Sequence, residues 1–165
     1  MSDGGGDGDP RDPRGPRGPR GPRKEPKPRP APIADAESEA YWAAAHEGRL
    51  IVQRCTACGH HQLYPRWRCL RCRGQVEWVD ATGGGTVYSF TVIRQNFSRS
   101  FRHLIPYVVA LVDLHEGPRV MTNLVGIDPD DVRIGMRVRV RFEAVSEDAS
   151  IPLFEPADPV ASAPT

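Results

Sequence analysis

The chain has 165 residues and a formal net charge of +1, which leaves room for one ordinary domain or two very small ones and excludes a large multidomain enzyme. The charge is uneven: residues 1–32 hold eight Lys or Arg and five Asp or Glu, so the remainder carries a formal charge of −2 and gives little support to nucleic-acid binding. No apolar run approaches the roughly 20 residues of a membrane span, and no apolar leader opens the sequence, so we expect a soluble cytoplasmic protein.

The N-terminal segment is rich in Gly, Pro and charge, with three Gly-Pro-Arg triplets at 15–23. After Met1, its first 32 residues contain no apolar side chain larger than Ala or Pro. Such a segment cannot bury enough surface to offset the entropy of ordering. We therefore predict a disordered tail over 1–34, which serves solubility or contacts an acidic partner, and a flexible C-terminus over 157–165.

A helix is expected to open the ordered part. Asp35 is a candidate N-cap, the stretch 36–47 is rich in helix formers, and Gly48 suits the position just after a helix. Tyr41 and Trp42 would supply an apolar face, and we expect both to pack in a core. A helix this short is marginal alone, so it must dock on something.

The remaining sequence predicts a mainly β protein. Short strands at 50–54 and 76–79 flank the cysteines, and longer ones are expected at 86–93, 107–114, 119–125 and 137–143. Turn signals lie at 115–118 and 127–136, and Gly83, Gly84 and Gly85 resemble a hinge. Four or five strands favour a small barrel over a sandwich. We predict two units, a helix with a metal ribbon over 35–82 and a barrel over 83–156.

Four cysteines fall within 18 residues and form the strongest signal in the sequence. Cys55, Cys58, Cys69 and Cys72 make two C-x-x-C pairs separated by ten residues, the spacing of a rubredoxin-like zinc ribbon. Four thiolates complete a tetrahedral shell, so the predicted zinc is structural and activates no water. Iron is the chemical rival for the same sulfur set, and a disulfide is disfavoured by a reducing compartment.

Residues next to the cysteines also bear on this prediction. His60 and His61 follow the first pair, but four cysteines already complete the shell, so we place both rings outside it. Gly59 follows the first pair, whereas Arg73 occupies the matching place after the second pair and Gly74 comes one residue later. This is a mild irregularity, because that position favours glycine.

A loop at 94–103 interleaves cations with aromatic rings. The candidate contact residues are Arg94, Phe97, Arg99, Phe101 and Arg102, with His103 beside them. Arginines bind phosphates and phenylalanine rings stack on bases, so the loop suits single-stranded nucleic acid or an adenine-containing cofactor such as coenzyme A. The alternative is a solvated loop with a Phe side chain in the core.

A second group of cations lies within the last predicted strand. Arg137, Arg139 and Arg141 alternate with apolar residues and share one face. We prefer a solvated edge strand to a phosphate site here. The chain shows no nucleophile-elbow motif and no phosphate-binding glycine loop, so independent enzymatic activity is not expected.

Over residues 38–156 the sequence resembles the zinc-ribbon plus OB-fold proteins known as domain of unknown function 35. The matching motifs are Tyr41-Trp42, Gly48-Arg49-Leu50, the cysteine pairs, Tyr64-Pro65-Arg66, Glu77-Trp78, 85–92, Pro106-Tyr107, 109–112, Gly117, 122–126, 134–136 and Pro152-Leu153-Phe154. Arg73, Trp67, Arg68 and the tail depart from the pattern. The resemblance implies a small OB-fold barrel after the ribbon.

The resemblance further implies a non-catalytic accessory subunit of acyl-CoA metabolism. Similar proteins bind thiolase-fold or lipid-transfer-protein-like enzymes, including aldolases of steroid side-chain breakdown, or are joined to hotdog-fold hydratases. The metal role carries over to the four cysteines, and no catalytic role does. We therefore expect a hetero-oligomer in which this chain stabilises the enzyme and helps to hold a coenzyme A thioester. The rival hypothesis is a single-strand nucleic-acid binder of the OB-fold class.

Overall fold

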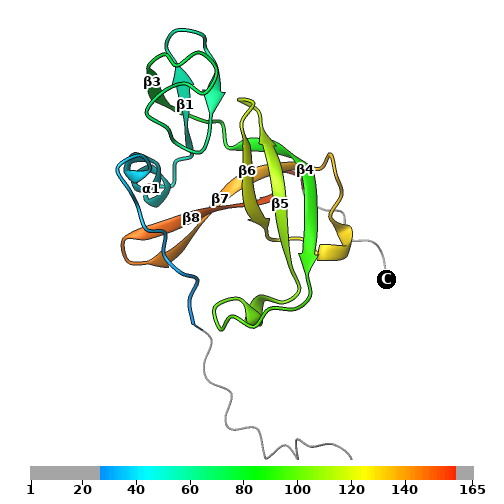
Figure 1. Cartoon of the computed structure of the whole chain (residues 1–165). Coiled ribbons are helices and arrows are strands. Elements are labelled where there is room, and N and C mark those ends of the chain that lie inside the picture. Colours follow the sequence, from blue (N-terminus) through cyan, green and yellow to red (C-terminus); the bar gives the residue numbers. More distant parts are fainter. Residues whose placement is uncertain (1–26, 159–165) are drawn as a thin grey trace, which may run out of the picture.

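One short helix and two small sheets make up the part of the chain that the computed structural model describes, residues 27–158 (Figure 1). The elements are α1 (Glu39–His46), β1 (Ile51–Cys55), β2 (His61–Gln62), β3 (Val76–Asp80), β4 (Gly84–Ile93), β5 (Tyr107–Leu114), β6 (Arg119–Leu124), β7 (Arg137–Ser146) and β8 (Ala149–Pro156), with single 3₁₀ turns at Arg102–Leu104 and Pro129–Asp131. Most of the predicted tail, 1–26, and residues 159–165 lie outside the described residues.

The helix α1 is shorter than the sequence predicts. The Asp35 carboxylate accepts hydrogen bonds from the backbone N–H and the hydroxyl of Ser38, so it caps a turn before the helix rather than the helix itself. Gly48 follows α1 with φ +77°, as predicted for a residue just past a helix end. Tyr41 is buried and Trp42 packs against the core, which confirms the predicted role of both rings.

Strands β1, β2 and β3 form the antiparallel ribbon sheet in the order β2-β1-β3. The central strand β1 pairs with β3 from Ile51↔Asp80 to Cys55↔Val76, and with β2 at only two positions. Buried Ile51 and Val52 anchor this small sheet, while its other end carries the first cysteine pair.

The other five strands close into a barrel with the order β4-β5-β6-β8-β7. The mainly β fold and the small barrel are therefore confirmed. Strand β8 was not predicted; it contains Pro152, and a proline normally argues against a central strand. The barrel is weakest between β6 and β8, which are paired in parallel at Leu124↔Phe154 alone.

Two further predictions about the barrel are wrong. Gly84 and Gly85 are not a hinge: both belong to β4 and pair with Arg139 and Val138 of β7. A Cβ at Gly85 would lie 2.6 Å from a Val112 methyl carbon, so close packing rather than flexibility explains this glycine. The strand β7 is not an edge strand, because it pairs with β4 on one side and β8 on the other.

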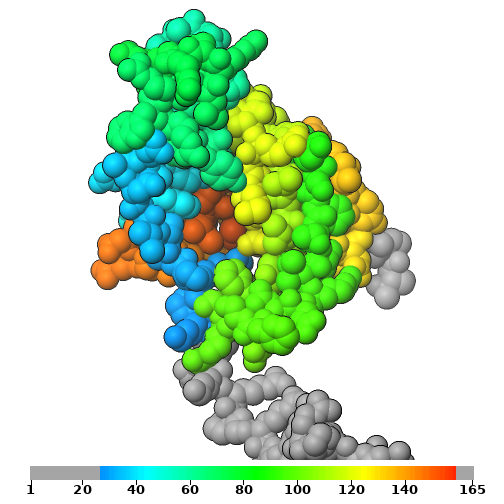
Figure 2. Space-filling view, in the orientation of Figure 1, coloured from blue at the N-terminus to red at the C-terminus, as the bar shows by residue number. Residues whose placement is uncertain are grey.

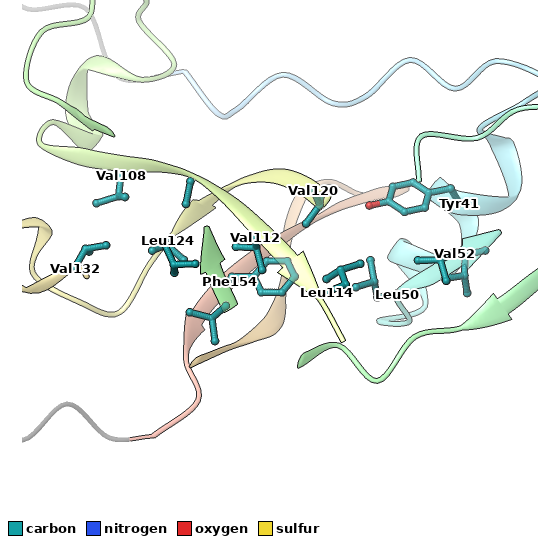
Figure 3. Packing of buried hydrophobic residues seen from close by; sticks show 14 of the residues in the cluster. Tyr41, Leu50, Val52, Val108, Val112, Leu114, Val120, Leu124, Val132 and Phe154 are labelled. Carbon is teal, nitrogen blue, oxygen red and sulfur yellow. The ribbon is translucent and has the colours of Figure 1, made fainter. Parts of the chain in front are cut away.

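A single apolar cluster joins the helix, the ribbon and the barrel. Figure 3 shows it as a continuous row from Val52 and Leu50 at the ribbon end, through Phe154, to Val108 and Val132 at the far end of the barrel. Phe154, Val52 and Val112 are fully buried. The ribbon therefore packs on the barrel through shared core residues instead of hanging from a flexible linker.

Candidate functional site

The fold brings all four cysteines together at the end of the ribbon. Their sulfur atoms lie within 4.8 Å of one another, with Cys55 and Cys72 3.5 Å apart and Cys58 and Cys69 3.8 Å apart. A tetrahedral zinc ion with Zn–S bonds of about 2.3 Å separates its sulfurs by about 3.8 Å. The donor set and its spacing therefore fit a four-coordinate zinc ion. Cys55 and Cys69 are buried, whereas Cys58 and Cys72 are exposed.

Backbone hydrogen bonds hold each pair in a tight knuckle. The N–H groups of Gly59 and Arg73 donate to the carbonyl oxygens of Cys55 and Cys69, both at 3.0 Å. Two further N–H groups donate to the sulfurs themselves. The Arg71 N–H donates to the Cys69 sulfur at 3.3 Å, and the Gly74 N–H donates to the Cys72 sulfur at 3.4 Å. Such bonds stabilise thiolates, which is the form that binds metal.

The surroundings of Cys55 and Cys72 shift the pKa values of these two thiols in opposite directions. Backbone hydrogen bonding, chiefly from Cys58, lowers the pKa of the Cys55 thiol to about 6. The Gly74 N–H also lowers the pKa of Cys72, but the neighbouring sulfurs of Cys58 and Cys55 outweigh it and raise that pKa to about 12. A bound dication would replace the thiol protons, because metal binds the thiolate form.

The irregular second knuckle has a geometric explanation. Arg73 takes the left-handed conformation with φ +65°, the same backbone conformation as Gly59 at +68°. Gly74 has a different role, because a Cβ there would lie 3.2 Å from the sulfurs of both Cys55 and Cys72, which is closer than ordinary van der Waals contact. The second pair therefore keeps the knuckle geometry and has its glycine where a side chain would crowd the sulfurs.

The histidines lie beside the cysteines but outside the cluster. Among the described residues, the group able to hold a metal contains the four cysteines alone. His60 contributes its backbone oxygen, which accepts from the Cys55 N–H at 2.9 Å. Both rings instead line a cavity of about 270 Å³ between the ribbon and the β5–β6 hairpin, together with Glu116 and Pro118.

The cationic-aromatic loop at 94–103 is tied into the fold by its own residues. Arg94 forms an ion pair with Asp130 at 2.7 Å, and Arg102 donates to the Phe97 carbonyl oxygen at 2.9 Å. Phe101 packs against Tyr107 with ring centroids 6.1 Å apart, whereas Phe97 is 77% exposed. The ligand contacts predicted for this loop, including Arg99, remain a prediction.

The three arginines of β7 share one exposed face, as predicted, and each has an acidic partner. Arg137 pairs with Asp158 at 2.7 Å. Arg139 and Arg141 both pair with Glu155, at 2.8 and 3.7 Å. This face is therefore not a bare cationic stripe, which argues against a phosphate site there.

Sequence reasoning missed Arg29, which lies inside the predicted tail. Its side chain is only 9% exposed and forms an ion pair with Glu143 at 2.8 Å. It also donates to the Asn123 amide oxygen at 2.8 Å and lies over the Phe101 ring, 5.8 Å from the centroid. No sequence signal marked it, because one arginine among eight Lys and Arg residues in a Gly/Pro-rich segment looks like the others.

A groove of about 530 Å³ was also missed. It lies between α1, the ribbon loop around Tyr64 and the barrel, at the weakly paired seam between β6 and β8. Figure 2 shows the hollow between the blue N-terminal segment and yellow β6, with atoms of β8 visible at its base. Its residues come from six separate segments, so only the tertiary structure assembles it.

Comparison with known families agrees with this architecture. Residues 42–78 match the family described as ChsH2, rubredoxin-like zinc ribbon domain, and residues 78–143 match ChsH2, C-terminal OB-fold domain. A DUF35 domain-containing scaffold protein of Methanocaldococcus jannaschii is 36% identical over 101 residues, which cover 60% of this chain and 71% of that protein. The chain belongs to the DUF35 family. Its predicted fold, a zinc ribbon followed by an OB-fold barrel, is confirmed.

Two further similarities are to a hydratase subunit and to a chain of an aldolase structure. A probable enoyl-CoA hydratase alpha subunit of Thermomonospora curvata is 41% identical over 133 residues, which cover 79% of this chain but 41% of that protein. This DUF35 chain thus spans about two fifths of that relative. A chain in the structure of Ltp2-ChsH2(DUF35) aldolase is 38% identical with a TM-score of 0.71, and the match covers 77% of this chain and 99% of that one. Within residues 27–158, none of the helices is long and apolar enough to cross a membrane.

Proposed function

We propose that this DUF35 protein is a non-catalytic accessory subunit that binds and stabilises a thiolase-like or lipid-transfer-protein-like acyl-CoA enzyme in lipid or steroid side-chain metabolism. The single observation that carries the proposal is the likeness to the chain in Ltp2-ChsH2(DUF35) aldolase, which extends over 99% of that chain. A relative that matches along its whole length supports a similar mode of assembly.

The site chemistry agrees with a non-catalytic role. A closed shell of four thiolates leaves zinc no open position for water or substrate, so the ion holds the ribbon together and takes no part in a reaction. The ribbon shares its apolar core with the barrel, so zinc would also fix the surface that the barrel presents. We place the enzyme contact on α1 and the barrel surface, in a cytoplasmic hetero-oligomer with the zinc form preferred to iron.

A contact with the coenzyme A part of the substrate belongs to this proposal. We place it at the loop 94–103, where Phe97 offers an exposed ring for the adenine. Nucleic acid is a weaker alternative, because its repeating phosphates need several free cations, whereas Arg94 of the loop and the three arginines of β7 already have acidic partners. A hotdog-fold hydratase is a second possible partner class, supported by the hydratase subunit from Thermomonospora curvata.

Co-expression tests the proposal. The full chain would be produced with each thiolase-fold, lipid-transfer-protein-like and hydratase enzyme encoded near it, and the mixtures separated by size exclusion. We expect one enzyme to co-elute with the chain and to be more soluble with it than without it. A Cys69→Ser variant should weaken co-elution, whereas Thr56→Ser in the same ribbon should not. Failure of every folded candidate enzyme to co-elute would overturn the proposal.

A further inference from the structure

We propose that Arg29 occupies a recognition site for arginine that follows proline, and that the Pro-Arg units of the N-terminal segment exchange with one another in this site. The site is formed by the Phe101 ring, the Asn123 amide and the Glu143 carboxylate, and Arg29 fills it in this structure. The inference concerns this chain alone and does not depend on the proposed accessory role.

The three groups of the site contact different parts of one guanidinium. The Arg29 Nε atom lies 2.8 Å from a Glu143 carboxylate oxygen, and Nη1 donates to the Asn123 amide oxygen, also at 2.8 Å. The Cζ atom lies over the Phe101 ring, 5.8 Å from its centroid. The ammonium of a lysine has a single nitrogen and lacks this planar fork, so the site selects arginine over lysine.

The walls of the site are held by contacts that do not involve the bound arginine. The Asn123 amide nitrogen donates to the Val108 carbonyl oxygen at 2.9 Å, which leaves the amide oxygen directed at the guanidinium. The Phe101 ring packs against Tyr107, with ring centroids 6.1 Å apart. Glu143 lies within β7, which is paired with β8 along its length. The site is therefore organised before an arginine enters it.

The position of the site gives the bound arginine a structural role. Asn123 lies in β6 and Glu143 in β7, and β8 separates these two strands in the barrel order. Strands β6 and β8 are paired at a single position, Leu124↔Phe154. An arginine in the site thus ties two strands together across the weakest seam of the barrel. Protection of the backbone around Asn123 from hydrogen exchange should therefore report whether the site is filled.

The segment that carries Arg29 is held chiefly through this one side chain. Within residues 27–34, Arg29 and Pro32 are half-buried and the other residues are exposed. The Lys27 N–H donates to the Arg99 carbonyl oxygen at a long 3.4 Å. Figure 2 shows the blue atoms of this segment against the green loop that contains the site's aromatic ring. Recognition therefore depends on the guanidinium more than on the residues around it.

The chain carries five more units of the same kind. They are Pro10-Arg11, Pro13-Arg14, Pro16-Arg17, Pro19-Arg20 and Pro22-Arg23. Each offers the same guanidinium after a residue whose φ is fixed by its ring. When Arg23 replaces Arg29, the connection to α1 lengthens from residues 30–38 to residues 24–38, and the entropy of closing a loop grows only slowly with its length. Because the units share one chain, their effective concentration at the site is high.

Hydrogen exchange of the full chain tests the exchange of units. One variant is Arg29→Ala, and the combined variant adds alanine at the five earlier arginines. We expect the backbone around Asn123 to exchange at least about threefold faster in the combined variant than in Arg29→Ala, because the earlier arginines partly refill the site. Equal rates in the two variants would overturn the exchange of units.

Two controls show where the earlier arginines act. A variant that loses the five earlier arginines but keeps Arg29 should exchange at the wild-type rate around Asn123. A rise in this variant as large as in the combined one would mean that those arginines act elsewhere, which contradicts the inference. The order of rates should also be the same at low and high protein concentration. Refilling that grows with concentration would assign the arginine to a second copy and refute exchange within one chain.

Peptide binding tests which side chain the site recognises. The combined variant is titrated with acetyl-Gly-Pro-Arg-Gly-amide and with its lysine counterpart, and NMR follows the side-chain amide of Asn123. We expect the arginine peptide to bind at least about tenfold more tightly, because only a guanidinium reaches both the carboxylate and the amide oxygen. Equal binding of the two peptides, or no binding of either, would refute the recognition site.

A milder variant keeps the test valid if the combined variant does not fold. Glu143→Gln retains all arginines and the shape of the side chain but removes the charge that pairs with Arg29. It should accelerate hydrogen exchange around Asn123, whereas Glu147→Gln, at an exposed position of the β7–β8 hairpin, should not. No difference between these two variants would show that the carboxylate does not hold the arginine.

Discussion

At the scale of single residues, the second cysteine knuckle shows how a position that favours glycine tolerates another residue. Arg73 has φ +65°, a conformation that costs an L-residue roughly 1–2 kcal/mol relative to glycine. Two hydrogen bonds hold the chain there: the Arg73 N–H donates to the Cys69 carbonyl oxygen, and the N–H of the next residue, Gly74, donates to the Cys72 sulfur. A bound metal therefore helps to maintain this conformation.

We predict that Arg73→Gly stabilises the ribbon by up to about 1 kcal/mol, since relief of the left-handed strain exceeds the added entropy of the unfolded chain. Chemical denaturation followed by tryptophan fluorescence measures the change. Arg71→Gly is the matched control, because Arg71 does not have a positive φ, and it should not stabilise. Equal effects of the two substitutions would contradict the explanation.

At the scale of elements, the link between ribbon and barrel depends on the β5–β6 hairpin. The Glu116 carboxylate accepts from the Thr82 N–H at 2.7 Å, and the His115 N–H donates to the Gly84 carbonyl oxygen at 3.1 Å. Within the described residues, the second carboxylate oxygen of Glu116 is buried without a hydrogen-bond partner. The hairpin thus fixes the short connection that leads from β3 to β4.

This carboxylate predicts a pH dependence. Burial alone would raise the pKa of Glu116, but hydrogen bonds from Thr82 and the nearby His115 outweigh it and hold the pKa below the usual value. The resulting stability is present above the pKa of an unfolded Glu, about 4.3, and is lost as the pH falls through the lower folded value.

We expect Glu116→Gln to destabilise the protein at pH 7 by less than about 1 kcal/mol, because solvent screens a partly exposed group. The difference from wild type should disappear in acid below the folded pKa, and denaturation at several pH values measures it. Glu147→Gln, in the β7–β8 hairpin, is the control and should show no such convergence. A constant difference at all pH values would contradict the assignment.

The segment 27–34 is a second element whose contribution to stability can be measured. Arg29→Ala removes the partner of both Glu143 and Asn123, so it should cost about 1–2 kcal/mol of the free energy of unfolding. Lys27→Ala removes the same charge two residues away and should cost less than about 0.5 kcal/mol. Hydrogen exchange of the backbone around Asn123 should rise in the first variant alone. Similar effects of the two changes would mean that only net charge matters.

At the scale of the whole molecule, the shared core couples the metal to the barrel. Leu50, Ile51 and Val52 belong to the ribbon side, yet they pack in the same cluster as Val112 and Phe154 of the barrel. A structural zinc ion contributes on the order of 10 kcal/mol to the folding of a zinc-finger peptide. Loss of zinc should therefore destabilise the barrel as well as the ribbon.

We predict that a chelator removes one equivalent of zinc and lowers the melting temperature of the barrel as well as that of the ribbon. Circular dichroism of the strands, with released zinc measured by a chromogenic dye, follows both events. The Cys69→Ser variant should match the chelated wild type, and excess zinc should restore only the wild type. A barrel transition unaffected by chelation would show that the two units are stable independently.

Local sequence determined the metal centre and most of the elements. Two C-x-x-C pairs specify a sulfur shell because the two residues between cysteines turn both sulfurs toward one point. Alternating apolar residues specify strands such as 137–143, since the side-chain period of a strand is two. Gly48 marks the end of α1 because a left-handed residue there is easiest for glycine. All these features depend on neighbours within a few positions.

Only the tertiary structure decided which distant residues meet. It assigned a strand to Pro152, whose carbonyl oxygen accepts from Thr122, and gave Arg29 its partners 94 and 114 residues away in the sequence. It also showed that a Val112 methyl group leaves no room for a side chain at Gly85, and that the groove opens where β6 and β8 are paired at a single position. These outcomes depend on barrel closure and packing between segments far apart in the chain, which local periodicity does not encode.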